Sequence, residues 1–184
     1  MDKARFIGGL ALARMWPVLE VAGSPFLAEL DEIVVRCGTR ESVECAAEVE
    51  SLNLWREKYG KLEDSRESGY FASIAAGVAL MVVSKDFDAD VRRWRVTSNV
   101  SNFWAACDDI LHVGGGFLRA EFKGVKMTLE AVEDVWRHRD VELFAVASEA
   151  RGGIYDERLS KVRSTYPKRR EIARVLADCA GWVV

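Results

Sequence analysis

The sequence predicts an all-α fold, a compact single-domain bundle of about eight or nine helices over residues 1–184. Three observations support this fold class. Apolar residues recur at helical spacing along the whole chain, with no alternation of strands and helices. Helix caps and glycine stops divide the helical segments and leave mostly short connections. Only three prolines occur, so long helices can run without interruption.

The N-terminal third predicts three helices. An apolar run at 6–13 lies after two basic residues and faintly imitates a secretory signal, but the run is short and Arg14 ends it, so we expect a helix of the mature fold. Ser24-Pro25 predicts the start of a helix over 24–38, with serine as the N-cap and proline at the first helical position. A further helix is expected over 39–60, between a threonine cap and a glycine stop.

The middle of the chain predicts a buried helix and then a long one. The apolar run at 70–83 suits a helix buried on nearly all sides and is shorter than the roughly 20 residues that span a bilayer. Helical spacing resumes over 90–113, although the TSNVSN segment at 97–102 is a poor helix interior and a candidate break. Alternation at 117–127 leaves a short β-hairpin about Lys123-Gly124 as an open alternative.

Four helices complete the predicted bundle. Thr128 caps the first and Asp140 is expected to cap the second. A third starts at Asp156 and ends before Pro167, because the residue before proline disfavours the helical conformation. The last helix is predicted over 168–180.

Aromatic residues and cysteines are expected to be mostly structural. We expect the C-terminal Trp182 to dock the tail onto the body. Cysteines lack CxxC spacing, and a chain of this size needs no disulfides, so the thiols are expected to be buried and reduced in a cytoplasmic protein. The tryptophans on apolar helical stripes, which we expect in the core, are Trp55, Trp94, Trp104 and Trp136.

Two acid–histidine pairs are the best candidates for chemistry. Asp108 with His112, and Asp134 with His138, are each four residues apart and so share a helix face. Carboxylate and imidazole suit zinc, iron or manganese, and the two pairs could meet as a four-ligand site of a small metal-dependent enzyme. The alternative, which we favour, is that these residues lie at ordinary helix ends and bind no metal. Histidine is favoured near a helix C-terminus by the helix dipole.

No other motif predicts catalysis or a cofactor. The triple glycine at 114–116 comes after a helix, whereas phosphate loops precede one. The chain has no G-x-S-x-G motif, and each cysteine is more simply a small core residue. We therefore predict no catalytic residues, no resident metal and no cofactor.

Charge is segregated along the chain. Residues 29–67 hold eleven acids against six bases, and residues 151–174 hold eight bases against three acids. Such patches steer partners, unless the two regions simply face each other within the domain or are solvated helix faces. The net charge of −3 and pI of about 5.6 argue against nucleic acid as the partner.

These observations favour a non-catalytic protein-binding domain without a membrane partner. An acidic face suits a cationic partner, and small inhibitors such as the bacterial immunity proteins that neutralise a toxin belong to this class. The metal-dependent enzyme is the alternative. The residues predicted to contact the partner are Glu41, Glu44, Glu48 and Glu50.

Overall fold

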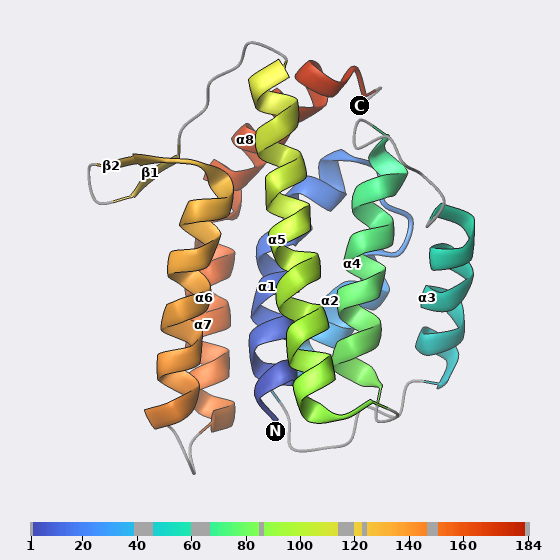
Figure 1. Cartoon of the computed structure of the whole chain (residues 1–184), viewed down its shortest axis with the longest axis vertical. Coiled ribbons are helices and arrows are strands. Elements are labelled where there is room, and N and C mark those ends of the chain that lie inside the picture. The colour runs from blue at the N-terminus through green and yellow to red at the C-terminus, as the bar shows by residue number, and fades with distance from the viewer. Residues whose placement is uncertain are drawn as a thin grey trace.

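A computed structural model describes residues 2–38, 46–59, 67–84, 87–113, 120–122, 125–146 and 151–182. Within these residues the fold is an all-α bundle, as predicted, and Figure 1 shows its helices with a small hairpin at one side. The helices are α1 (Lys3–Val21), α2 (Leu27–Arg36), α3 (Ala46–Tyr59), α4 (Ser68–Val83), α5 (Ala89–Val113), α6 (Leu129–Val146), α7 (Arg151–Ser164) and α8 (Tyr166–Ala180).

Helix α1 is the centre of the bundle. The Asp2 carboxylate accepts a hydrogen bond from the Arg5 backbone N–H at 2.9 Å and so caps its first turn. Fifteen of its nineteen residues are buried, and it packs against α2, α4, α5, α6, α7 and α8. The segment that imitates a secretory signal is thus the innermost helix of this fold.

On one side of α1 the contact is apolar and close. A Cβ atom at Gly8 would lie 2.4 Å from Val82 Cγ2, so glycine lets α1 and α4 approach each other. Helix α4 is buried on most of its surface, as its composition predicts. Its Phe71 ring meets Phe103 of α5 edge-on at 5.1 Å and Trp182 at 5.3 Å, which confirms that Trp182 docks the tail onto the body.

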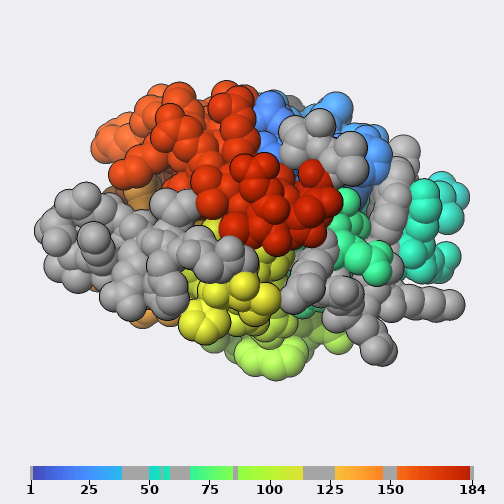
Figure 2. Space-filling view, turned by 90° about the horizontal axis from the view of Figure 1, so that it is seen from above, coloured from blue at the N-terminus to red at the C-terminus, as the bar shows by residue number. Residues whose placement is uncertain are grey.

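Helix α8 closes one end of the bundle. It packs on α1 and α5, and in Figure 2 it lies between the N-terminal helices and the end of α5. Its end at the left-handed Gly181, with φ of 75°, agrees with the predicted stop. Beside α6, strand β1 (Ala120–Phe122) pairs antiparallel with β2 (Val125–Met127), which is the hairpin that the sequence left open.

Four local expectations are not met. Helix α7 begins at Arg151, before the predicted start at Asp156. Helix α2 begins at Leu27 without a side-chain cap, and the Ser24 hydroxyl is buried with no partner in the described residues. Helix α5 is unbroken through 97–102, because its buried residues Val96, Val100 and Phe103 pack into the core and override weak propensity. Asp140 caps no helix, because α6 continues through it. Over the described residues, no helix is long and apolar enough to cross a membrane.

Candidate functional site

In the first acid–histidine pair, Asp108 has a structural role at the start of α6. Both carboxylate oxygens of Asp108, near the end of α5, accept hydrogen bonds at 2.9 Å, one from the backbone N–H of Leu129 and one from that of Glu130. Asp108 therefore caps the N-terminus of α6, where a negative charge is favourable. Burial raises the pKa of Asp108, while these two N–H donors act to lower it.

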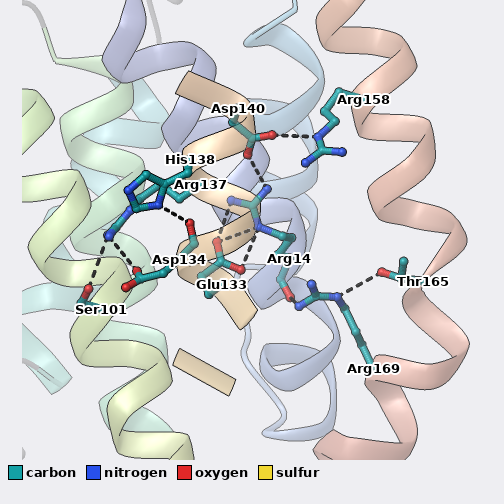
Figure 3. Close-up of polar contacts among 10 residues, drawn as sticks. All are labelled: Arg14, Ser101, Glu133, Asp134, Arg137, His138, Asp140, Arg158, Thr165 and Arg169. Atoms are coloured by element: carbon teal, nitrogen blue, oxygen red, sulfur yellow. Dashed lines mark hydrogen bonds and ion pairs between the residues drawn. The ribbon is translucent and has the colours of Figure 1, made fainter. Parts of the chain in front are cut away.

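The second pair is engaged within α6. The Asp134 carboxylate accepts from Arg137 at 2.6 Å, and His138 Nδ1 donates to the Asp134 backbone carbonyl at 2.7 Å (Figure 3). In the part of the chain that the structure describes, no group of three or more His, Cys, Asp or Glu side chains is placed to hold a metal ion. The two acid–histidine pairs therefore do not form the four-ligand metal site within the described residues.

A buried ionic network instead joins α1, α6 and α7. Arg14 is fully buried, and its guanidinium meets Glu133 at 2.6 Å and Asp140 at 2.7 Å (Figure 3). Asp140 also accepts from Arg158 of α7 at 2.8 Å. Two carboxylates of α6 thus bind guanidinium groups from α1 and α7.

Arg14 stays charged despite its burial. Burial acts to lower the pKa of Arg14, but the charges and hydrogen bonds of Glu133 and Asp140 outweigh it and raise the pKa. A buried cation needs such partners, because desolvation of an isolated charge costs several kcal/mol. Removal of Arg14 would leave Glu133 buried without an ion-pair partner, whereas Asp140 would retain Arg158.

Sequence reasoning missed this network, although signals were present. Arg14 interrupts an apolar helix, and a charged residue inside a buried helix requires an ion-pair partner. Glu133 and Asp140 are seven residues apart, which places them on one helix face. These signals indicate that partners exist, but they do not indicate which residues are the partners.

The predicted acidic face lies mostly outside the described residues. Glu41 and Glu44 are outside them, as is the side chain of Glu48, whereas Glu50 is exposed on α3. Elsewhere the acidic and basic regions meet directly, because Arg163 of α7 pairs with Asp31 of α2 at 2.6 Å. Part of the charge segregation in the sequence is therefore used within the fold.

Three exposed apolar side chains lie at the start of α5 and just before it. Trp94 is 68% exposed, with Val91 at 40% and Phe87 at 38%. The prediction that Trp94 belongs to the core is wrong, whereas Trp104 is buried and Trp136 is partly buried against the core as expected. The side chain of Trp55 lies outside the described part of the chain. Helical periodicity identifies an apolar face but not what covers it. We call Phe87, Val91 and Trp94 the Trp94 stripe.

Cations and a groove adjoin the Trp94 stripe. The Arg95 guanidinium lies 5.0 Å from the centre of the Phe87 ring, and Arg93 forms an exposed pair with Asp90 at 3.1 Å. A groove of about 350 Å³ runs beside Trp94 between α3, α4 and α5, with Gly77 on α4 and Arg56 on α3 among its lining residues. The stripe therefore combines a large exposed aromatic, arginines and a neighbouring concave surface.

Comparison with protein-family models, with curated proteins and with solved structures finds no match to this chain. Its function is therefore inferred from its own residues. The fold and the surface define an all-α protein with a charged interior network and an exposed aromatic stripe flanked by arginines.

Proposed function

We propose that this chain is a non-catalytic protein-binding domain, and that the Trp94 stripe docks onto an acidic surface of another protein. The observation that carries the proposal is the 68% exposure of Trp94 on a helix whose later turns are buried. Tryptophan and arginine are the residues most enriched among those that dominate binding energies at protein interfaces. Contiguous exposed apolar surface next to polar residues marks such interaction sites.

Charge around the stripe favours an acidic partner. Arg93 and Arg95 flank Trp94 in sequence, and Arg56 lies across the adjoining groove. The Arg93–Asp90 pair is exposed on both sides, so it contributes little and can be exchanged for a carboxylate of the partner. Complementary charge of this kind chiefly speeds association and sets specificity.

The expected acidic face remains a separate prediction. A cationic partner, such as a toxin that an immunity protein neutralises, would be bound through Glu41, Glu44, Glu48 and Glu50. Charge reversal of Glu44, Glu48 and Glu50 should then weaken the complex. The same substitutions should leave the complex unchanged if the Trp94 stripe alone is the interface.

Site-specific photo-crosslinking tests the proposal even though the partner is unidentified. A benzophenone amino acid is placed at position 94 or 91 in the native host, with position 146 as the matched control, because Val146 is an 85% exposed valine away from the stripe. We expect one discrete adduct with another protein from positions 94 and 91 and none from position 146. Absence of such an adduct, or an adduct with a second copy of this chain only, contradicts the proposal.

The isolated complex then tests the chemistry of the stripe. Trp94→Ala should weaken it by about tenfold or more, whereas Trp94→Phe should retain most of the affinity, because an aromatic anchor is preserved. Arg93→Glu and Arg95→Glu should slow association at low salt. Unchanged binding by Trp94→Ala would refute the proposed interface.

A further inference from the structure

A second concave site opens to solvent between α1, α5, α6 and α8. It is a cleft of about 190 Å³. Its apolar walls come from all four helices and include two tryptophans, Trp104 and Trp136. Its polar lining residues are Glu133, Thr165, Lys168 and Arg169. An apolar cavity with a few convergent polar groups is the usual form of a small-molecule site.

The hydrogen-bonding groups left unused at this cleft are donors. Trp104 is buried, and its Nε1–H has no acceptor among the described residues. Arg169 donates from Nε to Thr165 Oγ1 at 3.0 Å and from Nη1 to the Arg14 carbonyl at 3.4 Å (Figure 3), but no carboxylate of the described residues pairs with it. The Arg169 guanidinium lines the cleft without a carboxylate partner among the described residues, so a ligand that supplies an anionic acceptor would gain a charge-assisted hydrogen bond there.

The one carboxylate among the described residues that line the cleft is already satisfied. Arg14 Nε donates to both oxygens of Glu133, at 2.7 and 2.8 Å. Glu133 therefore neither requires a cationic ligand nor carries an uncompensated charge that would repel an anion. The arrangement favours a ligand with acceptor oxygens over one with donor groups.

The charges near the cleft also favour a ligand with acceptor oxygens. Three guanidinium groups, those of Arg14, Arg158 and Arg169, face two carboxylates, so the cluster carries one positive charge in excess. Burial, and the nearby Arg14 cation, lower the pKa of Arg169 to about 10, although Glu133 acts to raise it. At neutral pH Arg169 is thus a cation that no carboxylate of the described residues pairs with, and Lys168 adds a second cation among the lining residues.

The volume limits the size of the ligand. A cavity of roughly 150 Å³ lined by apolar side chains accommodates benzene. The cleft therefore has room for one ring or a short branched chain, together with a small head group. Carboxylate is the head group best matched to guanidinium, because both are planar and can share two hydrogen bonds.

We propose that this cleft binds a small amphipathic carboxylate, with a single ring or short branched chain against Trp104 and Trp136 and its carboxylate on Arg169. This site is independent of the Trp94 stripe, so it stands or falls separately from the proposed protein-binding function.

Ligand-observed NMR tests the proposal on the intact protein. The probes are benzoate, phenylacetate, 3-methylbutanoate and hexanoate, each up to about 5 mM, a range that detects weak binding. Phenylacetamide is the uncharged counterpart of phenylacetate. We expect at least one carboxylate to bind, and phenylacetamide to bind at least about tenfold more weakly than phenylacetate. The proposal is overturned if no carboxylate binds, or if the amide binds as well as the acid.

Two matched variants locate the site. Arg169→Gln should weaken carboxylate binding by about tenfold or more, because the charge-assisted contact is lost. Arg174→Gln removes an exposed arginine of the same helix and should change the affinity less than about twofold. Equal affinity of the two variants would overturn the assignment to this cleft. The comparison of acid with amide needs no variant, so a folding defect in Arg169→Gln would not affect that part of the test.

Discussion

Helix α1 meets the two sides of the molecule through different chemistry. Toward α4 and α5 the contact is apolar, and Gly8 allows Val82 to approach closely. Toward α6 the contact includes a buried ionic network, because Arg14 binds Glu133 and Asp140 in the interior, beside an aromatic contact of Phe6 with Phe144. One helix therefore takes part in a close-packed apolar layer and in a buried polar layer.

The apolar contact and the ionic network should respond differently to substitutions. Apolar packing loses free energy in proportion to the volume that is removed or added, and the neighbours partly adjust. A buried ionic network behaves as a unit, since each charge is tolerable only while its partners are present. A buried ion pair is weak evidence for stability, so we expect the network to select which helix faces meet rather than to increase overall stability.

The largest expected effect comes from breaking the ionic side. Arg14→Met should lower the free energy of unfolding by about 3–5 kcal/mol, because Glu133 is left buried without its ion-pair partner and Asp140 retains only Arg158. Urea denaturation measures the change, with the exposed Arg174→Met as a control that should stay within about 0.5 kcal/mol. Adding Glu133→Gln to Arg14→Met should recover much of the loss, because it removes the unpaired carboxylate while Asp140 keeps Arg158 as its partner. A loss under about 1 kcal/mol for Arg14→Met alone would contradict the comparison.

The apolar side should respond less strongly. Gly8→Ala places a Cβ atom 2.4 Å from Val82 Cγ2. We expect a net loss of about 1–2 kcal/mol, since overpacking costs about 1–3 kcal/mol and alanine regains up to about 1 kcal/mol of helix propensity. The double variant Gly8→Ala/Val82→Ala should be more stable than the sum of the two single effects predicts. Strict additivity would show that α1 and α4 are not in close contact at Gly8.

Asp108 links the two sides, from the end of α5 to the start of α6. Asp108→Ala should cost about 1 kcal/mol, because two backbone N–H groups of α6 lose their acceptor. Asp108→Asn should cost less, since asparagine also caps helices. The neighbouring Asp109→Ala is the control, as Asp109 is exposed. Thermal denaturation of the three variants should rank them in this order, and equal losses for Asp108→Ala and Asp109→Ala would argue against the cap.

Arg169 should give the smallest effect, and of opposite sign. It lies next to Arg14 but pairs with no carboxylate of the described residues, so Arg169→Met should raise the free energy of unfolding slightly, by about 0.5 kcal/mol. The folded-state pKa of Arg169 is lowered to about 10, so the wild type carries this cost at neutral pH and loses it as the pH rises above about 10. The gain from Arg169→Met should therefore be present at pH 7. Destabilisation at pH 7 would contradict this prediction.

Much of the fold could be predicted from local signals. Thr128 caps α6 as expected, since its Oγ1 accepts from the Ala131 backbone N–H at 3.2 Å. The stop at Gly181 and the buried character of α4 also depend on residues within a few positions. Asp140 shows where local reasoning fails, because an acid that resembles a cap in sequence lies inside a helix and pairs with Arg14 and Arg158.

The two proposed sites depend on packing that the sequence does not specify. Trp94 and Trp104 both lie on apolar positions of α5, yet one is exposed and the other is buried beside a cleft. Periodicity predicts burial for both tryptophans. It indicates the direction in which a side chain leaves its helix but not whether another element covers that side chain.

The sequence by itself determined the helical class, the positions of most helices and the apolarity of α4, because caps, stops and periodicity act over a few residues. The tertiary structure decided that Arg14 meets Glu133 and Asp140, which are 119 and 126 residues away. The tertiary structure also places Arg169 at a cleft, where no carboxylate of the described residues pairs with it. Such pairings depend on which helix faces come together, and the burial of the whole core selects those faces rather than any local pattern.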